Sequence, residues 1–342
     1  MKKFILSLLS CCYAAFLLAA PFNSGSDGSD GALVFDPDLG DVIFDPDDID
    51  PALDPDRDGV YHFTTITIGP GTTVLLRGDV MGHKPAIWLA AGDVTIMGEI
   101  NLGPIGPLPG AGGFYGGQSS GLVDGQGPGG TSGAVSSEVP ELPTNDYINP
   151  FLVPLIGGSG QGAPQSGSGL GGGGAFLLAS STRIEITGYI RAIDGGSLRL
   201  IANEITGEWG SVEADHIRAE AYQHNYSNYY GDDIRLSRPG LVFYDNPIKI
   251  TVVDSVAVAN NPGANKNAPD AEIINSGSTT IQVECSRIPL GTTIRVVGWN
   301  ETYGKVEAVT GPLTGTLEAS TATCEMIIPP GYTTFMAQAV LN

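Results

Sequence analysis

The chain has 342 residues, of which 42% are hydrophobic, so it is long enough for one large domain or two ordinary ones with a real core. Glycine is frequent at 49 residues and charged residues make up only 15%, a composition that favours strands and turns over helices. The formal net charge of −21 is repelled by nucleic acid and anionic membranes, which excludes them as expected partners, and it favours cations such as calcium.

The first predicted element is an export signal at residues 1–20. Two lysines precede an apolar run from Phe4 to Leu18, and small alanines follow. The stretch LLSC also resembles a lipobox, which would make Cys11 a lipid anchor, and a retained membrane anchor is a further alternative. No later apolar run is long enough to span a bilayer. We therefore expect a secreted or cell-surface protein with no transmembrane anchor after signal removal.

An acidic segment rich in Asp-Pro pairs, residues 21–60, follows the signal. Its sharpest pattern is DPDRDG, in which Asp54, Asp56 and Asp58 stand at alternate positions before a glycine. Hard cations such as calcium take several oxygen ligands, so this pattern predicts a calcium loop. It is not an EF-hand, because Thr65 stands where the bidentate glutamate would be. The alternative is an acidic, solvated linker.

Short alternating strands are expected across residues 61–222, with a long interruption at about 103–174. The interruption holds 23 glycines in 72 residues and no Gly-X-Y period, which excludes collagen. Such a composition cannot build its own apolar core. Its one apolar island, residues 149–160, is expected to dock onto the ordered body.

After the interruption the chain repeats itself. The stretches AFLLASSTRIEITGYIRAIDGG and SLRLIANEITGEWGSVEAD share their strands and corners, and Gly188 and Gly210 are 22 residues apart. A period in the low twenties with short strands predicts a short parallel β-solenoid, closed by a cap or linker at 223–247. The side chains expected to face its core are Phe176, Leu178, Ile184, Ile186, Ile190, Leu198, Leu200, Ile205, Val212 and Ala214.

Side chains on the outer face of this solenoid are the candidates for binding or chemistry. A polysaccharide lyase or hydrolase would place charged residues there, but any solvated face has them too. The outward candidates are Arg183, Glu185, Arg191, Asp194, Arg199 and Glu213. Exposed aromatic rings stack on sugars, whereas capping aromatics are buried. The aromatic candidates for ligand binding are Trp209, Tyr226, Tyr229 and Tyr230.

The region 248–342 contains seven strand candidates at regular spacing, separated by turn signals such as NNPG and IPPG. This spacing predicts a β-sandwich that is Ig-like in architecture only, because the Cys–Trp–Cys spacing of antibody domains is absent. Cys285 and Cys324 would form a disulfide in an oxidising compartment, closing a loop of about 40 residues.

Several of these segments together resemble a known group. They are DPDRDGVYHFTTITIGPGTTV, IWLAAGDVTIMGEINL, the GGGGAFLLASSTRIEITGYIRA repeat and LRLIANEITG. They are similar to uncharacterised, exported, glycine-rich bacterial β-helix proteins and, more distantly, to the β-helix passengers of adhesins. The resemblance covers roughly residues 33–215. It implies export and a repeat fold, and it supplies no catalytic motif.

The sequence contains no established catalytic motif, and its four histidines share no spacing, so we name no catalytic residue. The expected function is a secreted or cell-surface structural or adhesive protein. The alternative is a β-helix protein that binds or degrades extracellular polysaccharide. A further alternative is self-association into an extracellular β-rich filament. Beyond possible calcium, no cofactor is expected.

Overall fold

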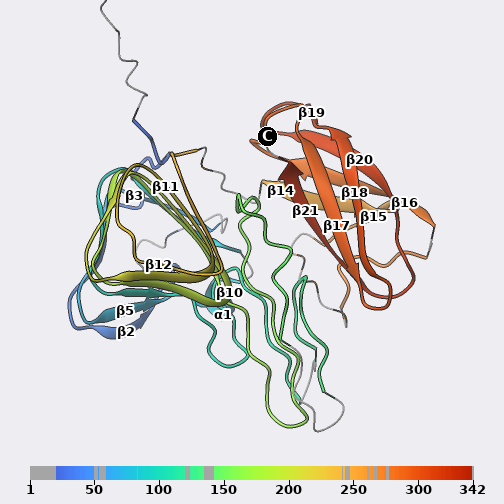
Figure 1. Ribbon diagram of the computed structural model, residues 1–342, viewed down its shortest axis with the longest axis horizontal. Coiled ribbons are helices and arrows are strands. Elements are labelled where there is room, and N and C mark those ends of the chain that lie inside the picture. The colour runs from blue at the N-terminus through green and yellow to red at the C-terminus, as the bar shows by residue number, and fades with distance from the viewer. Residues whose placement is uncertain are drawn as a thin grey trace, which may run out of the picture.

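The computed structural model describes residues 21–49, 53, 59–82, 84–119, 124–134, 142–240, 242, 247–259, 262, 264, 266, 268–274 and 277–340. The described chain is all-β apart from one short helix (Figure 1). Its elements are β1 (Leu33–Phe35), β2 (Gly40–Ile43), β3 (Val60–Phe63), β4 (Ile66–Ile68), β5 (Thr72–Leu75), α1 (Gly78–Met81), β6 (Ala86–Ala90), β7 (Val94–Ile96), β8 (Glu99–Asn101), β9 (Ala175–Ile186), β10 (Tyr189–Thr206), β11 (Ser211–Asn225), β12 (Tyr229–Tyr230), β13 (Asp233–Ser237), β14 (Ile248–Val253), β15 (Val256–Ala257), β16 (Ser278–Cys285), β17 (Thr293–Asn300), β18 (Gly304–Pro312), β19 (Thr314–Gly315), β20 (Ser320–Ile327) and β21 (Thr333–Val340).

The first 13 strands form one parallel sheet that curls around itself, which we call the curled sheet. Figure 1 looks along it and shows a three-cornered outline. The first side holds β3, β6, β13 and parts of β9, β10 and β11. The second side holds β1, β4, β7 and further parts of β9, β10 and β11. The third side holds β2, β5, β8, β12 and the remaining parts of β10 and β11.

Alternate side chains of most strands fill the inside of the curled sheet, as a period of two requires, whereas the end strands β2 and β13 add none to the buried core. All ten side chains predicted to face the core lie in one buried cluster, which confirms that part of the prediction. An aromatic group lies within the same cluster. The ring of Trp88 lies 5.1 Å from Phe44, 5.9 Å from Phe63 and 5.2 Å from Phe176, measured between centroids.

The curled sheet is longer at both ends than the predicted range 61–222. At its start, β1 and β2 pair with β4 and β5. At its end, β12 and β13 pair with β11, although residues 223–247 were predicted as a cap or linker. These end strands are two to five residues long. The apolar islands Leu33–Phe35 and Val42–Phe44 indicate the first two in the sequence, whereas polar residues conceal β12 and β13.

A column of glycines at the corner between the second and third sides explains the repeated sequence. A Cβ on Gly188 would lie 1.8 Å from the carbonyl oxygen of Gly98, and a Cβ on Gly210 would lie 2.0 Å from that of Gly188. Successive turns of the chain therefore touch through bare backbone here. Gly98, Gly188 and Gly210 therefore stand at the same place on successive turns, and the last two are 22 residues apart, which is the length of the repeat.

The glycine-rich insertion, here the described residues of 103–174, is packed through its backbone. Phe114 N donates to Gly158 O at 3.1 Å, Gly158 N to Gly173 O at 2.8 Å, and Gly172 N to Phe114 O at 2.9 Å. Because these three segments bond to one another in a cycle, they form a bundle and not a flat sheet. A Cβ on Gly172 would lie 1.8 Å from Gly158 O, so this contact requires glycine.

The apolar island of the insertion docks as predicted, and it contacts both neighbouring bodies. Leu155 packs against an apolar patch on the outside of the curled sheet. Val153 joins the core of the C-terminal strands, and Leu152 packs beside Met336. The insertion therefore joins the curled sheet to the C-terminal region (Figure 1).

The C-terminal body, residues 247–340, contains two antiparallel sheets. One has the strand order β15-β14-β16-β20-β19 and the other the order β18-β17-β21. Buried side chains from both sheets, such as Ile281 and Val296, belong to one core cluster. Hydrogen bonds attach this body to the insertion: Gln338 Nε2 donates to Tyr147 O, Thr334 Oγ1 donates to Pro128 O at 3.0 Å, and Gly127 N donates to Ala264 O at 3.3 Å.

The predicted disulfide is absent from the structure, because Cys285 and Cys324 are free, buried thiols. They lie on neighbouring strands, but Cys285 is opposite Ser320 and Cys324 is opposite Ile281. An offset of four residues separates their Cα atoms by more than the roughly 7 Å that a disulfide can bridge. Strand register, which the sequence spacing does not reveal, decides this. Burial raises the pKa of the Cys285 thiol to about 12.

Within the described part of the chain, no helix combines the length and apolar character needed to cross a membrane.

Candidate functional site

The outer face of the third side carries a column of functional side chains. Arg191, Glu213 and Tyr230 are register partners on three successive turns, so their Cβ atoms follow one another at roughly 4.8 Å. They face outward because their neighbours Ile190 and Val212 face the core. The parallel register of the curled sheet thus builds a polar and aromatic row from residues far apart in sequence.

Arg191 begins this row, and three neighbouring side chains contact its guanidinium group. Its Nε is 3.2 Å from Glu213 Oε2, and its NH1 is 3.5 Å from Glu99 Oε1. Its guanidinium carbon lies 4.6 Å from the ring centroid of Tyr189, a cation–π distance. The charge of Arg191 is therefore matched, and Glu213 is fixed in position.

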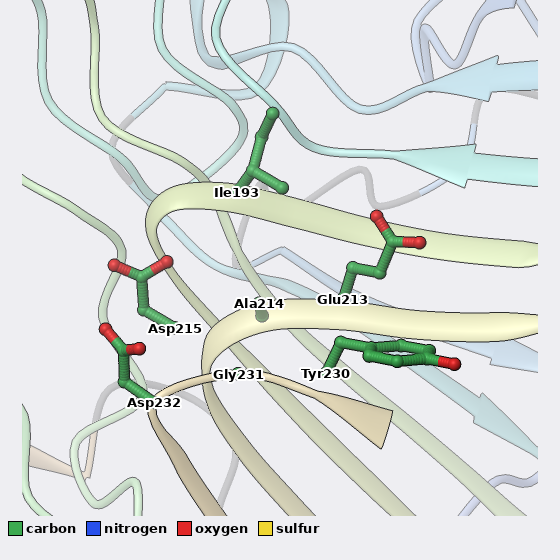
Figure 2. A pocket seen from close by; sticks show the side chains of 7 residues that line it. All are labelled: Ile193, Glu213, Ala214, Asp215, Tyr230, Gly231 and Asp232. Atoms are coloured by element: carbon green, nitrogen blue, oxygen red, sulfur yellow. The ribbon is translucent and has the colours of Figure 1, made fainter. Parts of the chain in front are cut away.

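A pocket of about 430 Å³ lies beside this row, at the corner between the third and first sides. Figure 2 shows Asp215 and Asp232 projecting side by side from the corner, while Glu213 and the ring of Tyr230 lie along the sheet face. The lining residues are Ile193, Glu213, Ala214, Asp215, Tyr230, Gly231 and Asp232.

The corner is acidic, and the charge of Asp232 acts on Asp215. Asp215 Oδ2 accepts a hydrogen bond from Gly195 N at 3.0 Å. Burial, followed by the nearby charge of Asp232, raises the pKa of Asp215 above its ordinary value. Burial also raises the pKa of Asp194, one turn earlier, and lowers that of His216. The histidine is thus biased towards its neutral form and does not balance the carboxylates.

The four predicted ligand-binding aromatics divide into two pairs. Tyr226 and Tyr229 are buried, with ring centroids 5.1 Å apart in an edge-to-face contact, and they cap the core of the curled sheet. They are not accessible to a ligand, which corrects the prediction for these two. Tyr230 is 60% exposed and lines the pocket, and Trp209 is 88% exposed at the preceding corner.

One predicted outward charge, Arg199, is buried, which corrects its assignment to a solvated face. Its Nε is 2.9 Å from Glu220 Oε1, which also lies 2.7 Å from Arg218 Nε. Gly240 N donates to the second oxygen of Glu220 at 2.7 Å. The insertion covers this cluster, since Phe151 lies against Arg218 at 5.4 Å. This group is an internal, paired cluster and not a binding surface.

The predicted calcium ligands Asp54, Asp56 and Asp58 lie outside the described residues, as do residues 1–20 with Cys11. Among the residues that the structure describes, no group of three or more His, Cys, Asp or Glu side chains could hold a metal ion. The calcium loop therefore stays a prediction.

Sequence reasoning missed Asp215 and Asp232 as parts of the site. A signal was present, because the strands of the third side run into AID, EAD and YGD, which end at Asp194, Asp215 and Asp232. The tripeptides share one structural corner, and only the register makes this visible. Tyr189 was also missed, because one isolated tyrosine in a strand carries no signal of its own.

The fold and site together describe an all-β protein whose curled parallel sheet presents an aromatic and acidic row at one corner. No protein-family model, curated protein or solved structure matches the chain. The function is therefore argued from the geometry of the site itself.

Proposed function

We propose that the protein is a secreted or cell-surface structural and adhesive protein. In this proposal the curled sheet is a short β-solenoid, the C-terminal body is an Ig-like β-sandwich, and residues 1–20 are an export signal. The stacked, three-sided arrangement supports the solenoid interpretation. The resemblance to exported, glycine-rich bacterial β-helix proteins belongs to the same proposal.

The observation that carries the proposal is the way the insertion joins the two β-bodies. Tyr147 belongs to the insertion, and its ring lies 6.1 Å from that of Trp299 in the C-terminal body. Its hydroxyl donates to Gly157 O at 2.8 Å, and its carbonyl oxygen accepts from Gln338. Such buried contacts hold the bodies in one orientation, as a protein that presents a binding face under load requires.

The test is adhesion of the whole chain. Beads coated with the protein are passed over immobilised neutral, acidic and amine-bearing polysaccharides and over fibrous proteins, with albumin-coated beads as control. We expect retention on at least one surface under flow. If the beads adhere to none of the surfaces, the proposal is overturned.

The second candidate function is degradation of polysaccharide. Its supporting observation is the pair of neighbouring carboxylates, Asp215 and Asp232, in the pocket beside an exposed ring. The raised pKa of Asp215 is also a property of general acids. Incubation of the protein with each polysaccharide that retains the beads, followed by assay of new reducing ends, separates the candidates. Soluble products would favour degradation, and binding without products favours adhesion.

Calcium is part of the proposal through Asp54, Asp56 and Asp58. Three carboxylates at alternate positions before a glycine are the chemistry that calcium takes. The test is the melting temperature with calcium and with a chelator, for the chain and for a variant with all three aspartates changed to asparagine. A shift in the chain that the variant lacks supports the site, and equal behaviour of both contradicts it.

A further inference from the structure

The pocket at Tyr230 contains charge that the protein does not neutralise. Glu213 is paired with Arg191, but neither Asp215 nor Asp232 forms an ion pair with any described residue. The nearest imidazole, that of His216, has a lowered pKa and is biased towards its neutral form. Asp215 is half-buried and Asp232 is exposed. Two neighbouring carboxylates of this kind attract a cation, because a bound positive charge relieves their mutual repulsion.

The same pocket offers an aromatic face. Tyr230 is 60% exposed, and Figure 2 shows its ring lying along the sheet beside Glu213. Glu213 is fixed by Arg191, and its Oε1 accepts from Ser211 Oγ at 2.5 Å, so the wall next to the ring is rigid. A flat ring on a rigid base suits stacking with a sugar ring, whose C–H groups form an apolar face.

The size and the charge narrow the class of ligand. The hollow of about 430 Å³ is open to solvent, so it can hold one part of an extended ligand without enclosing it. The net charge of −21 and the local carboxylates disfavour anionic polysaccharides. A neutral sugar would stack on Tyr230 but leave the aspartates unpaired, and a linear polyamine would pair with the aspartates but leave the ring without a stacking partner.

We infer that this pocket binds an amine-bearing saccharide, with one sugar ring stacked on Tyr230 and the ammonium group of a neighbouring sugar unit between the carboxylates of Asp215 and Asp232. The inference rests on the proposed adhesive function and names its partner as a polymer of amino sugars. Successive sugar units would follow the outer row past Glu213 towards Tyr189.

The experiment is calorimetric titration of the full chain with four probes at matched salt. The probes are a glucosamine tetramer, its N-acetylated counterpart, a galacturonate tetramer and spermidine. The glucosamine tetramer is expected to bind at least tenfold more tightly than the others, and added salt weakens it. Equal affinity for the acetylated tetramer, or tighter binding of spermidine, would overturn the inference.

Two variants test the assigned atoms. Tyr230→Ala removes the stacking ring, and the double variant Asp215→Asn with Asp232→Asn removes the charge while keeping the shape. Each is expected to lower glucosamine-tetramer affinity at least tenfold. The matched controls are Tyr303→Ala, an equally exposed tyrosine in the C-terminal body, and Asp233→Asn, whose carboxylate is engaged by Arg235.

Unchanged circular dichroism and melting temperature show that each variant is folded. Full affinity in a folded Tyr230→Ala or double-asparagine variant contradicts the site. If beads adhere to other surfaces while the glucosamine tetramer fails to bind, this inference falls and the adhesive function stands. If beads adhere nowhere, both fall.

Discussion

The curled sheet and the glycine-rich insertion are held together by different physical means. In the curled sheet, branched and aromatic side chains such as Ile184 and Trp88 fill a continuous core. In the insertion, segments approach so closely that side chains have no room, and backbone hydrogen bonds such as that from Gly158 N to Gly173 O hold them.

The difference shows that order does not require an apolar core in every part of a chain. Backbone groups satisfy one another when glycine lets the segments touch, and many short hydrogen bonds then replace buried side chains. The insertion still depends on its neighbours, because Leu155 and Val153 anchor it to the two β-bodies. The two regions should therefore respond to opposite kinds of substitution.

The largest effect is expected from removing a core side chain of the curled sheet. Trp88 is fully buried among aromatic rings, so Trp88→Ala should lower the free energy of unfolding by about 4 kcal/mol. Trp209→Ala, at an 88% exposed position, is the control and should change it little. Urea unfolding measures both, and equal effects of the two changes would show that Trp88 does not support the core.

The next largest loss of stability is expected from adding a single methyl group within the insertion. Gly172→Ala places a Cβ 1.8 Å from Gly158 O, so the bundle has to open, at a cost of about 3 kcal/mol. The control is Gly311→Ala, because a Cβ there meets nothing within 4 Å. Hydrogen exchange across residues 110–174 gives the readout. Unchanged protection in Gly172→Ala would show that the bundle tolerates side chains.

A smaller effect is expected at the junction between the insertion and the C-terminal body. Gln338→Ala leaves the buried carbonyl of Tyr147 without its donor, which should cost about 1–2 kcal/mol. We expect faster limited proteolysis between the two bodies. The control is Gln282→Ala, because the side chain of Gln282 donates to the exposed Glu284 on its own strand and not across the junction. Identical cleavage of both variants would mean that this contact does not join the bodies.

The smallest effect is expected on the free energy of unfolding at alkaline pH. Burial raises the pKa of Cys285 to about 12, above the ordinary value of 9.0, so the folded state holds this proton more tightly than the unfolded state. Its contribution to stability is complete below pH 9 and is lost as the pH rises towards 12. Urea midpoints across this range should fall less in Cys285→Ala than in the unchanged chain. Parallel curves would contradict the shift.

The sequence predicts the inward side chains of the curled sheet well, because a period of two and a repeat of 22 residues are local patterns. It does not predict register, which places Cys285 and Cys324 four residues apart and gathers Asp215 with Asp232 in one corner. The sequence also does not show which polar side chains are buried. Arg199 alternates like a surface residue, yet a distant segment and Glu220 enclose it.

The insertion leaves the curled sheet after β8 and returns at β9, yet the turns on either side of it stack directly. Ile100 is paired with Ile190, and Trp88 with Leu178, as if the intervening residues were absent. The curled sheet therefore accepts a long insertion at this corner, and the strand register on either side of the insertion is unchanged. The pocket at Tyr230 lies at the same corner. Replacing the insertion by another sequence would therefore change the surroundings of the pocket but not the strands that carry its residues.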